Sequence, residues 1–366
     1  MNRTIILLVS VLMVSCSRSH SSPKGTQATH PEFTQETATA TFAGGCFWCM
    51  QPPFEKIAGV KTVFAGYTGG TKPNPAYEEV SAGGTGHMES IQITYDPRQT
   101  SYLKLLDVFW KNIDPIDEGG QFVDRGNQYR AAIFFHTPEQ RWCAEGSMAS
   151  LRQSGPFKGK TIVTMILPAS TFYKAEDYHQ DYYKKNPEDY HRYRNGSGRD
   201  PFIAAAWKNS TWSADTININ TFSLPDNSIL KKMLTSAQYR ITQEKGTEPP
   251  FHNAYWDNHL PGIYVDAVTG EPLFSSREKF DSGTGWPSFT LPLVAENVVE
   301  TNHSAVEKGG SEVHSRIGKA HLGDLFNAGP PPTHLRYCID SASLLFIAAN
   351  DLETHGYGRF KAIFGK

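Results

Sequence analysis

The sequence predicts two domains: an α/β domain built as an α+β two-layer sandwich, followed by a mainly antiparallel β domain. The chain has 366 residues and is 39% hydrophobic, which is enough for two separate cores. Strand-like and helix-like segments alternate in its first half, as in α/β and α+β proteins. In its second half, short apolar segments are broken by Gly, Pro, Asn and Asp, a pattern typical of antiparallel hairpins.

The first domain is predicted to begin with a strand over residues 37–45, where threonine alternates with apolar residues. The helix that follows contains Pro52 and Pro53, which fit a helix only in its first turn. This places Cys46 and Cys49 at or just before the helix N-terminus. The later elements are expected in the order strand 89–97, helix 101–113, strand 129–136, a helix that carries Cys143, strand 160–169 and a tyrosine-rich segment over 172–194.

The boundaries follow from composition. The first domain is predicted to span residues 39–195, a polar linker residues 196–226, and the second domain residues 227–362. We expect the second domain to open with one helix over 228–245. Its strands are expected within residues 262–276, 282–289 and 335–348.

The charge of the chain indicates no nucleic-acid or acidic partner. Its 35 lysines and arginines nearly balance its 37 aspartates and glutamates, and no long run of one sign occurs. We therefore expect no nucleic-acid binding, and we predict no cofactor.

The first sixteen residues resemble a secretory signal peptide. A basic start at Arg3 precedes the apolar run "IILLVSVLMV", which is too short to span a bilayer well, and small residues follow up to Cys16. The sequence "MVSC" also resembles a bacterial lipobox, which predicts acylation of Cys16 and a lipoprotein anchored in the cell envelope. A plainly cleaved signal and an uncleaved anchor are the alternatives, and all three predict export. Residues 17–38 are polar and predict a flexible tether.

Cys46 and Cys49 form a Cys-x-x-Cys pair, whose spacing alone leaves three functions open. Such a pair can bind zinc, exchange disulfides, or combine a nucleophile with its resolving thiol. Zinc needs four ligands, and the sequence offers no second Cys-x-x-Cys and no His pair, so we predict no metal. Cys143 is expected to be a packed helical thiol.

The surroundings of this pair resemble the A class of peptide-methionine sulfoxide reductases. The resemblance covers about residues 39–193 and rests on several motifs in order: "GCFW" (45–48), "AGYTGG" (65–70), "NPAYEEV" (74–80), "GHMES" (86–90) and "QYR" (128–130). It implies an α/β fold and reduction of methionine sulfoxide.

The chemistry of sulfoxide reduction assigns roles to these residues. The reaction needs a thiolate that attacks sulfur, a proton donor for the departing oxygen and an apolar cage for the methyl group. Cys46 near a helix N-terminus suits the first role, because the helix dipole favours the thiolate. The resulting sulfenic acid can condense with Cys49. The other predicted site residues are the proton donor Glu89, the phenols Tyr77 and Tyr129, the orienting or binding Asp124, and the cage Phe47 and Trp48.

The second half resembles the B class of the same activity over about residues 227–360. The motifs are "TEPP" (247–250), "YWDNHLPGIYVD" (255–266), "GEPLFSSREKFDSGTGWPSF" (270–289), "AHLGDLF" (320–326) and "RYCIDSASLLF" (336–346). The predicted site residues are the nucleophile Cys338, Arg336 to favour its thiolate, Trp286 to cage the methyl group, and His321 as proton donor or oxygen binder.

The second half also departs from its family at four positions. Asp324 replaces a second histidine, Ala328 an aspartate, Asp340 an asparagine, and Thr284 a resolving cysteine. Negative charge near Cys338 would raise the pKa of its thiol. The missing cysteine predicts that an external thiol, or a thiol of the first domain, reduces the Cys338 sulfenic acid.

The two classes reduce opposite sulfoxide epimers. The resemblances therefore imply a bifunctional enzyme that repairs oxidised proteins or peptides, with the S epimer reduced by the first domain and the R epimer by the second. Electrons would come from a thioredoxin-like partner by thiol-disulfide exchange. The alternatives are an envelope thiol-disulfide exchanger and a lipoprotein module that binds sulfoxides without turnover.

Overall fold

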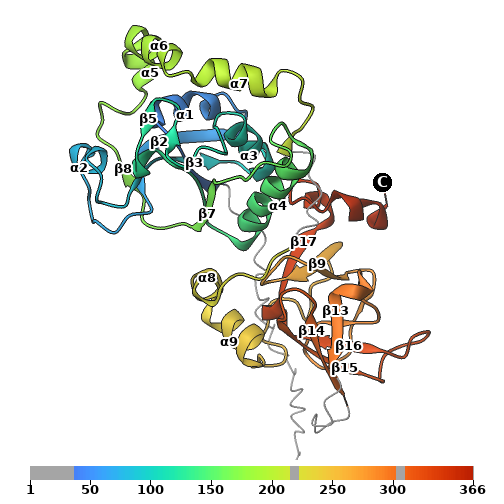
Figure 1. The fold of residues 1–366 in the computed structure, drawn as a ribbon. Helices are drawn as coiled ribbons and strands as arrows, with labels where there is room; N and C mark the ends of the chain where they lie inside the picture. The colour runs from blue at the N-terminus through green and yellow to red at the C-terminus, as the bar shows by residue number, and fades with distance from the viewer. Residues whose placement is uncertain (1–36, 215–221, 302–309, 366) are drawn as a thin grey trace, which may run out of the picture. The chain divides into compact units, whose positions relative to one another are not determined.

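The structure is a computed structural model and describes residues 37–214, 222–301 and 310–365 (Figure 1). The predicted signal sequence with Cys16, and residues 17–36 of the predicted tether, lie outside the described residues. No helix in the described ranges is long and apolar enough to cross a membrane.

The first domain is built on a six-stranded mixed sheet with the order β7-β6-β1-β3-β2-β8. All neighbouring strands are antiparallel except β6 and β7, which are parallel. The strands are β1 (Ala38–Gly44), β2 (Val60–Thr68), β3 (Met88–Tyr95), β6 (Ala131–Phe135), β7 (Met165–Pro168) and β8 (Tyr173–Lys174), with a separate hairpin of β4 (Gly120–Gln121) and β5 (Asp124–Arg125). The helices are α1 (Phe47–Glu55), α2 (Tyr77–Ser81), α3 (Tyr102–Trp110), the 3-10 helix η1 (Asn127–Tyr129), α4 (Pro138–Ser154), α5 (Tyr182–Lys185), α6 (Pro187–Gly196) and α7 (Arg199–Trp207).

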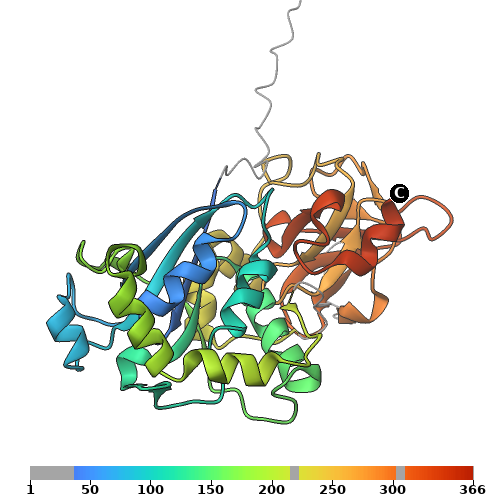
Figure 2. The same ribbon diagram turned by 90° about the horizontal axis from the view of Figure 1, so that it is seen from above.

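Successive side chains of β1 point to opposite faces of the sheet, and this alternation explains the layers of the domain. Phe42 points to one face of the sheet, where its ring stacks on Phe54 of α1 at 5.5 Å and on Phe109 of α3 at 5.0 Å between ring centroids. Both helices therefore cover the same face, where they lie side by side (Figure 2). Ala43, one residue on, packs on the opposite face with Phe134. The predicted sandwich of sheet and helices is confirmed.

Helix α1 differs from the prediction in where its prolines lie. It begins at Phe47, so Pro52 and Pro53 are its sixth and seventh residues, beyond the first turn. Proline has no N–H, so Pro53 cannot donate to the carbonyl of Cys49 four residues earlier. An arginine side chain takes that acceptor instead: Arg194 donates from Nη1 to Cys49 O at 2.9 Å. The expected position of Cys46 at the helix start is correct, because Cys46 is the N-cap residue.

The first domain also continues beyond the predicted boundary at residue 195. The segment expected to be a linker forms α7, and Arg199 at its start is only 1% exposed. Trp212 is buried as well and donates to Ser150 Oγ of α4 at 3.0 Å. "NGSGRD" has the composition of a loop, and its burial depends on contacts with distant segments that composition does not show.

The second domain consists of a three-stranded sheet, β10-β9-β17, and a six-stranded sheet, β11-β12-β16-β15-β14-β13, and the strand pairs within both are antiparallel. Its strands are β9 (Gly262–Asp266), β10 (Pro272–Ser275), β11 (Lys279–Phe280), β12 (Ser288–Phe289), β13 (Val298–Thr301), β14 (Ser311–Ser315), β15 (His321–Phe326), β16 (Arg336–Ile339) and β17 (Leu344–Ala348). Its helices are α8 (Asn227–Met233), α9 (Ser236–Glu244) and the 3-10 helices η3 (Ala295–Asn297), η4 (Ser341–Ser343), η5 (Ala349–Asp351) and η6 (Gly358–Phe364). The predicted antiparallel β architecture is confirmed.

Aromatic side chains join the two sheets of the second domain. Phe289 of β12 stacks on Phe274 of β10 at 4.5 Å and meets Tyr264 of β9 edge-on at 5.1 Å. These rings are completely buried and form the core of the domain.

The single helix expected over 228–245 is two helices. Leu234 has an extended backbone, and Thr235 begins α9 by accepting from the N–H of Gln238 while the Gln238 side chain accepts from the N–H of Thr235. This reciprocal capping box stabilises a new helix start in the middle of an apolar pattern that looks continuous.

Candidate active sites

The first predicted nucleophile lies at the turn between β1 and α1. Cys46 is 6% exposed, and its backbone ends the strand and caps the helix. Gly45 makes this turn with φ +80°, and a Cβ there would approach Gln121 Cβ to 2.6 Å and Arg199 Nη2 to 2.8 Å. Only glycine fits this conformation and this space.

Glu89 of β3 is brought to the start of α1. Its carboxyl is 2% exposed and its Oε2 accepts a hydrogen bond from the N–H of Phe47 at 3.1 Å. Burial raises the pKa of Glu89 to about 8, and the nearby Asp124 and Cys49 act in the same direction. Most of Glu89 is therefore protonated at neutral pH, the state that a proton donor needs.

The two predicted phenols lie on short elements beside this carboxyl. Tyr77 is the first residue of α2 and Tyr129 the last of η1, and the two side chains interact electrostatically with each other and with Glu89. Burial and the charge of Glu89 raise the pKa of Tyr77 to about 12 and that of Tyr129 further. Both phenols keep their protons across the physiological pH range. Asp124 of β5 accepts a hydrogen bond from the Tyr193 hydroxyl at 2.5 Å.

The two thiols have opposite pKa shifts. Burial, the hydrogen bond with Cys49 and the charge of Glu89 raise the pKa of Cys46 well above its ordinary value. The same hydrogen bond, with the guanidinium groups of Arg199 and Arg194, lowers the pKa of Cys49 to about 7. Burial thus opposes the effect of the helix N-terminus on Cys46, and the expected preference of that terminus for the Cys46 thiolate stays a prediction.

The aromatic residues between the thiols have different surroundings. Phe47 is 1% exposed and its ring contacts those of Tyr67 and His179. Trp48 is half-buried, stacks on Tyr182 with 3.8 Å between centroids and donates to His179 Nδ1 at 3.0 Å. The role of both rings as a methyl cage stays a prediction.

Sequence reasoning missed three contributors from the tyrosine-rich segment and beyond. His179 contacts both aromatic rings, Tyr193 links Asp124 to Cys46, and Arg199 lies against the turn before Cys46. The sequence did offer one signal for the first two, the density of aromatic polar residues over 172–194. Six tyrosines and two histidines in one polar segment are more than is usual for a solvent-exposed helix. No comparable pattern marked Arg199.

The second predicted nucleophile lines an open cavity of about 960 Å³. Cys338 of β16 pairs with Asp324 of β15 across the antiparallel ladder, so both side chains lie on the same face. Thr284 Oγ1 is 3.9 Å from Cys338 Sγ. The other cavity residues are Lys245, Gly246, Thr247, Trp286, Glu312, His321, Gly323, Phe326, Ala328, Arg336 and Asp340. The four predicted residues of this site thus share one cavity.

Opposing charges act on the Cys338 thiol. Burial raises its pKa most, and Asp340 and Asp324 raise it further. The Arg336 guanidinium and the hydrogen bond with Thr284 lower it without reversing the shift. Arg336 itself packs over the Phe326 ring, 4.5 Å from its centroid.

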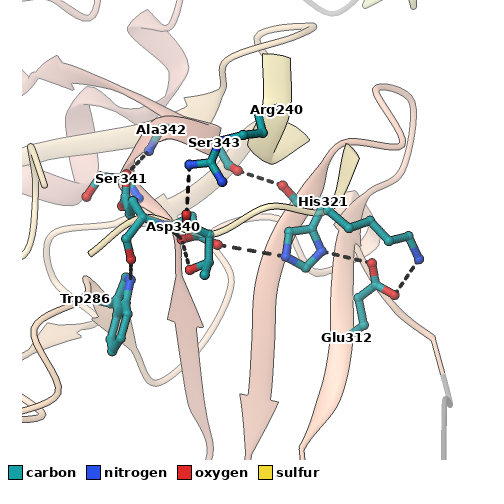
Figure 3. A network of polar contacts seen from close by, with 11 residues as sticks. Arg240, Trp286, Glu312, His321, Asp340, Ser341, Ala342 and Ser343 are labelled. Atoms are coloured by element: carbon teal, nitrogen blue, oxygen red, sulfur yellow. Dashed lines mark hydrogen bonds and ion pairs between the residues drawn. The ribbon is translucent and has the colours of Figure 1, made fainter. Parts of the chain in front are cut away.

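His321 belongs to a chain of charged groups along the wall of this cavity (Figure 3). Its Nδ1 lies 2.9 Å from Glu312 Oε1, and Lys245 Nζ donates to the other Glu312 oxygen at 2.9 Å. On its other side, His321 Nε2 lies 3.9 Å from Asp340 Oδ2. This arrangement fixes the plane of the imidazole with Nε2 toward Asp340.

Trp286 is held by a segment that sequence reasoning did not assign to the site. Its Nε1 donates to Glu248 O at 3.1 Å, while the Glu248 carboxylate accepts from the N–H groups of Ser341 and Ala342. The same segment fixes Asp340, whose Oδ1 accepts from Thr247 Oγ1 at 2.8 Å. "TEPP" therefore positions both the predicted cage and one of the unusual aspartates. Among the described residues, no group of three or more His, Cys, Asp or Glu side chains is placed to hold a metal ion.

Comparisons with known proteins agree with this arrangement. The family model described as peptide methionine sulfoxide reductase matches residues 38–211, and the SelR domain model matches residues 234–348. A Vibrio cholerae serotype O1 protein named peptide methionine sulfoxide reductase MsrA/MsrB is 44% identical over 372 residues, covering 98% of this chain and 97% of that protein. The chain belongs to this family. It is a two-domain oxidoreductase with one MsrA and one MsrB domain.

Two solved structures each match less than half of this chain. Methionine sulfoxide reductase A of Corynebacterium diphtheriae is 33% identical, with 42% of this chain and 76% of that chain covered and a TM-score of 0.38. Reduced Mxr1 from Saccharomyces cerevisiae is 29% identical, with 44% and 92% covered and a TM-score of 0.40. The MsrA family match ends at residue 211, in accord with a domain that includes α7.

Proposed function

We propose that the MsrA domain reduces the S epimer of methionine sulfoxide through Cys46 and that the MsrB domain reduces the R epimer through Cys338. The observation that carries the first assignment is the buried Glu89 carboxyl, which is bonded to the first N–H of α1 beside Cys46. A protonated carboxyl next to a thiol is what removal of a sulfoxide oxygen requires.

The first half-reaction uses groups already in place. Cys46 sulfur attacks the sulfoxide sulfur while Glu89 protonates its oxygen, with Tyr77 and Tyr129 donating hydrogen bonds to that oxygen. The protonated oxygen then moves from the methionine sulfur to the Cys46 sulfur as the bond between the two sulfurs breaks, so methionine leaves and Cys46 becomes a sulfenic acid. The proton lost by the Cys46 thiol replaces the one that Glu89 gave up. Because the Cys46 thiol is protonated in the empty site, we expect substrate binding to precede its ionisation.

In the second domain, His321 and Arg336 lie in the same cavity as Cys338. His321 is fixed by Glu312 and supplies the proton or holds the sulfoxide oxygen, while Arg336 partly offsets the charge of the two aspartates. Trp286 forms the apolar wall for the methyl group. This half-reaction also ends with methionine and a cysteine sulfenic acid.

Cys49 completes the first cycle. Condensation of its thiol with the Cys46 sulfenic acid gives a disulfide and water, and a thioredoxin-like dithiol then reduces the disulfide by exchange. In a Cys49→Ser chain, one equivalent of methionine should still form from the S epimer, while turnover with thioredoxin falls. Unchanged steady-state turnover with thioredoxin would contradict the resolving role of Cys49.

Cys338 is the only cysteine of residues 227–362, so its recycling must differ. We propose that a thiol from outside the domain reduces its sulfenic acid directly. A chain with Cys46→Ser and Cys49→Ser should accumulate a dimedone-reactive Cys338 after one turnover with the R epimer. Absence of that adduct, with methionine formed, would refute the proposal.

We also propose that the protein is exported, is lipid-anchored at Cys16 and repairs oxidised proteins of the cell envelope. Export and anchoring rest on the basic start, the short apolar run and the small residues before Cys16. Labelling of growing cells with a fatty-acid analogue should mark the full chain and spare a Cys16→Ala chain. Equal labelling of both would exclude Cys16 as the lipid site.

A further inference from the structure

Arg194 of α6 and Arg199 at the start of α7 lie next to the segment that carries the Cys-x-x-Cys pair. Arg199 is 1% exposed, and the side chain of Arg194 is 14% exposed. In Figure 1 both helices lie along the edge of the first domain that carries α1. Burial of a guanidinium costs free energy unless neighbouring groups bond to it or interact favourably with its charge. The groups around a buried arginine therefore indicate its role.

Arg199 bonds to neutral groups in the described part of the chain. It donates from Nη2 to Gly44 O at 2.9 Å and from Nη1 to Asn112 O at 2.6 Å, and Nη1 is 3.5 Å from Met50 Sδ. Its guanidinium lies 4.6 Å from the centroid of the Phe122 ring. These hydrogen-bond partners carry no charge, and the positive charge of Arg199 acts on the Cys49 thiol and on the Asp124 carboxyl.

Arg194 is tied to Cys49 itself. Its Nη1 donates to Cys49 O, the carbonyl that Pro53 leaves without a helical partner. Its other nitrogens pair with Asp200 Oδ1 at 2.8 and 2.7 Å, which fixes the guanidinium in place. Pro53 therefore removes one backbone hydrogen bond of α1, and the Arg194 guanidinium replaces it at the carbonyl of Cys49.

The charges around Cys49 come from several elements. Arg194 and Arg199 are positive, Asp124 of β5 is negative, and the ionisable neighbours Cys46, Glu89 and Tyr190 also interact with it. The pKa of Cys49 is lowered to about 7 despite its burial. The hydrogen bond with Cys46 and the two guanidinium groups thus act on the Cys49 thiol in the direction of the thiolate.

We propose that Arg194 and Arg199 are positioning residues for the second step of the MsrA cycle: they fix the backbone around the Cys46–Cys49 pair and place positive charge beside the Cys49 thiol for its attack on the Cys46 sulfenic acid. The proposal rests on the proposed function. Cys49 sulfur attacks Cys46 sulfur, the S–S bond forms and the S–O bond breaks. Cys49 is oxidised and the sulfenic sulfur is reduced, and the hydroxide takes a proton from solvent by way of Glu89 to leave as water.

The test separates the two steps in a single turnover. A full chain with Cys338→Ser is reduced and mixed with one equivalent of an S-sulfoxide peptide, and methionine, sulfenic acid and the Cys46–Cys49 disulfide are quantified against time from pH 5.5 to 9.5. Arg199→Met keeps the apolar contacts, Arg199→Lys keeps the charge, and Arg194→Met removes the second cation. Arg192→Met is the matched control, since Arg192 is 78% exposed on α6.

In the parent, disulfide formation should rise with pH to a plateau, with a midpoint set by ionisation of the Cys49 thiol. In Arg199→Met and Arg194→Met that midpoint should move up by at least one pH unit, and the rate at pH 7 should fall by about tenfold, as the thiol returns toward its ordinary pKa. Methionine formation should fall much less than disulfide formation in both variants, because the two cations act on the second step. Arg199→Lys and Arg192→Met should follow the parent profile.

Three results would overturn the proposal. An unchanged pH midpoint in Arg194→Met would do so, even if Arg199→Met does not fold. Equal losses in methionine and disulfide formation would indicate a structural role only. A parent that forms methionine without a Cys46–Cys49 disulfide would refute the proposed recycling itself, which distinguishes that failure from the first two.

Discussion

At the scale of single residues, burial sets the protonation states of the first site. Glu89 and Cys46 are both withdrawn from water, and each is held in its protonated form until substrate arrives. Cys49 is equally withdrawn, yet the hydrogen bond with Cys46 and two guanidinium groups act in favour of its thiolate. Residue identity alone predicted the three participants; their protonation depends on neighbours that only the fold brings together.

Glu89→Gln removes the proton donor while it keeps the size of the side chain. We expect the rate of S-epimer reduction to fall by about 10² to 10⁴, the usual contribution of a positioned acid. The acid form of Glu89 is lost as pH rises through about 8, so the parent rate should decline above that pH and the variant should lack this decline. A pH–rate profile with dithiothreitol measures both effects.

The control is Glu118→Gln, which removes an exposed carboxyl of the same domain. It should leave the rate and the profile unchanged. A Glu89→Gln chain with the parent rate would contradict the role of this residue as the acid.

Asp324 and Asp340 provide a prediction for the second site. Both raise the pKa of Cys338, so Asp324→His with Asp340→Asn should lower it and increase R-epimer reduction near pH 7 several-fold. The amide oxygen of an asparagine at position 340 can still accept the hydrogen bonds from Thr247 and Glu248, so the cavity should keep its shape. Reactivity of Cys338 toward iodoacetamide against pH, in a chain without Cys46 and Cys49, measures the shift; an unchanged or higher midpoint would refute it.

At the scale of elements, the sequence predicted the regular parts well. Strand β1, helix α3 and strand β6 lie close to their expected ranges, because alternating and helical apolar patterns mark them directly. The prediction from sequence failed where contacts between distant segments determine the structure. Pro52 and Pro53 lie deeper in α1 than local rules allow, and a distant arginine replaces one of the hydrogen bonds that they remove. Segment 196–214 has linker composition but packs on its domain.

The turn between β1 and α1 allows a matched comparison of glycines. Gly45 and Gly83 both have φ +80°, but a Cβ at Gly83 would meet nothing within 4 Å, whereas one at Gly45 would collide with Gln121 and Arg199. Gly83→Ala should cost about 1–2 kcal/mol of stability from its backbone conformation alone.

Gly45→Ala should cost about 1–3 kcal/mol more from overpacking and should abolish S-epimer reduction, while R-epimer reduction continues. Urea unfolding of each chain and epimer-resolved assays measure these effects. Equal behaviour of the two alanine chains would show that crowding at the Cys46 turn is unimportant.

At the scale of the whole molecule, the chain combines two unrelated folds for one chemistry. Each domain places its predicted nucleophile, the buried Cys46 or the partly exposed Cys338, in one site with an acid or an imidazole, but the elements that do so share neither sequence nor topology. The motifs of both domains were visible in the sequence because each is a short run around a reacting residue. The supporting residues Glu312, Arg194 and Arg199 lie outside those runs and were not predicted. Glu248 lies within "TEPP", but its contacts with Ser341 and Ala342 appear only in the fold.

The central claim is that two independent sites divide the sulfoxide epimers between them. The direct test measures reduction of S- and R-methionine sulfoxide peptides by the full chain, by Cys46→Ser and by Cys338→Ser, with dithiothreitol as reductant and Cys143→Ser as control. Cys46→Ser should lose S-epimer reduction and keep R-epimer reduction, Cys338→Ser should show the reverse, and Cys143→Ser should keep both. Loss of both activities in either single variant, or retention of S-epimer reduction without Cys46, would contradict the claim.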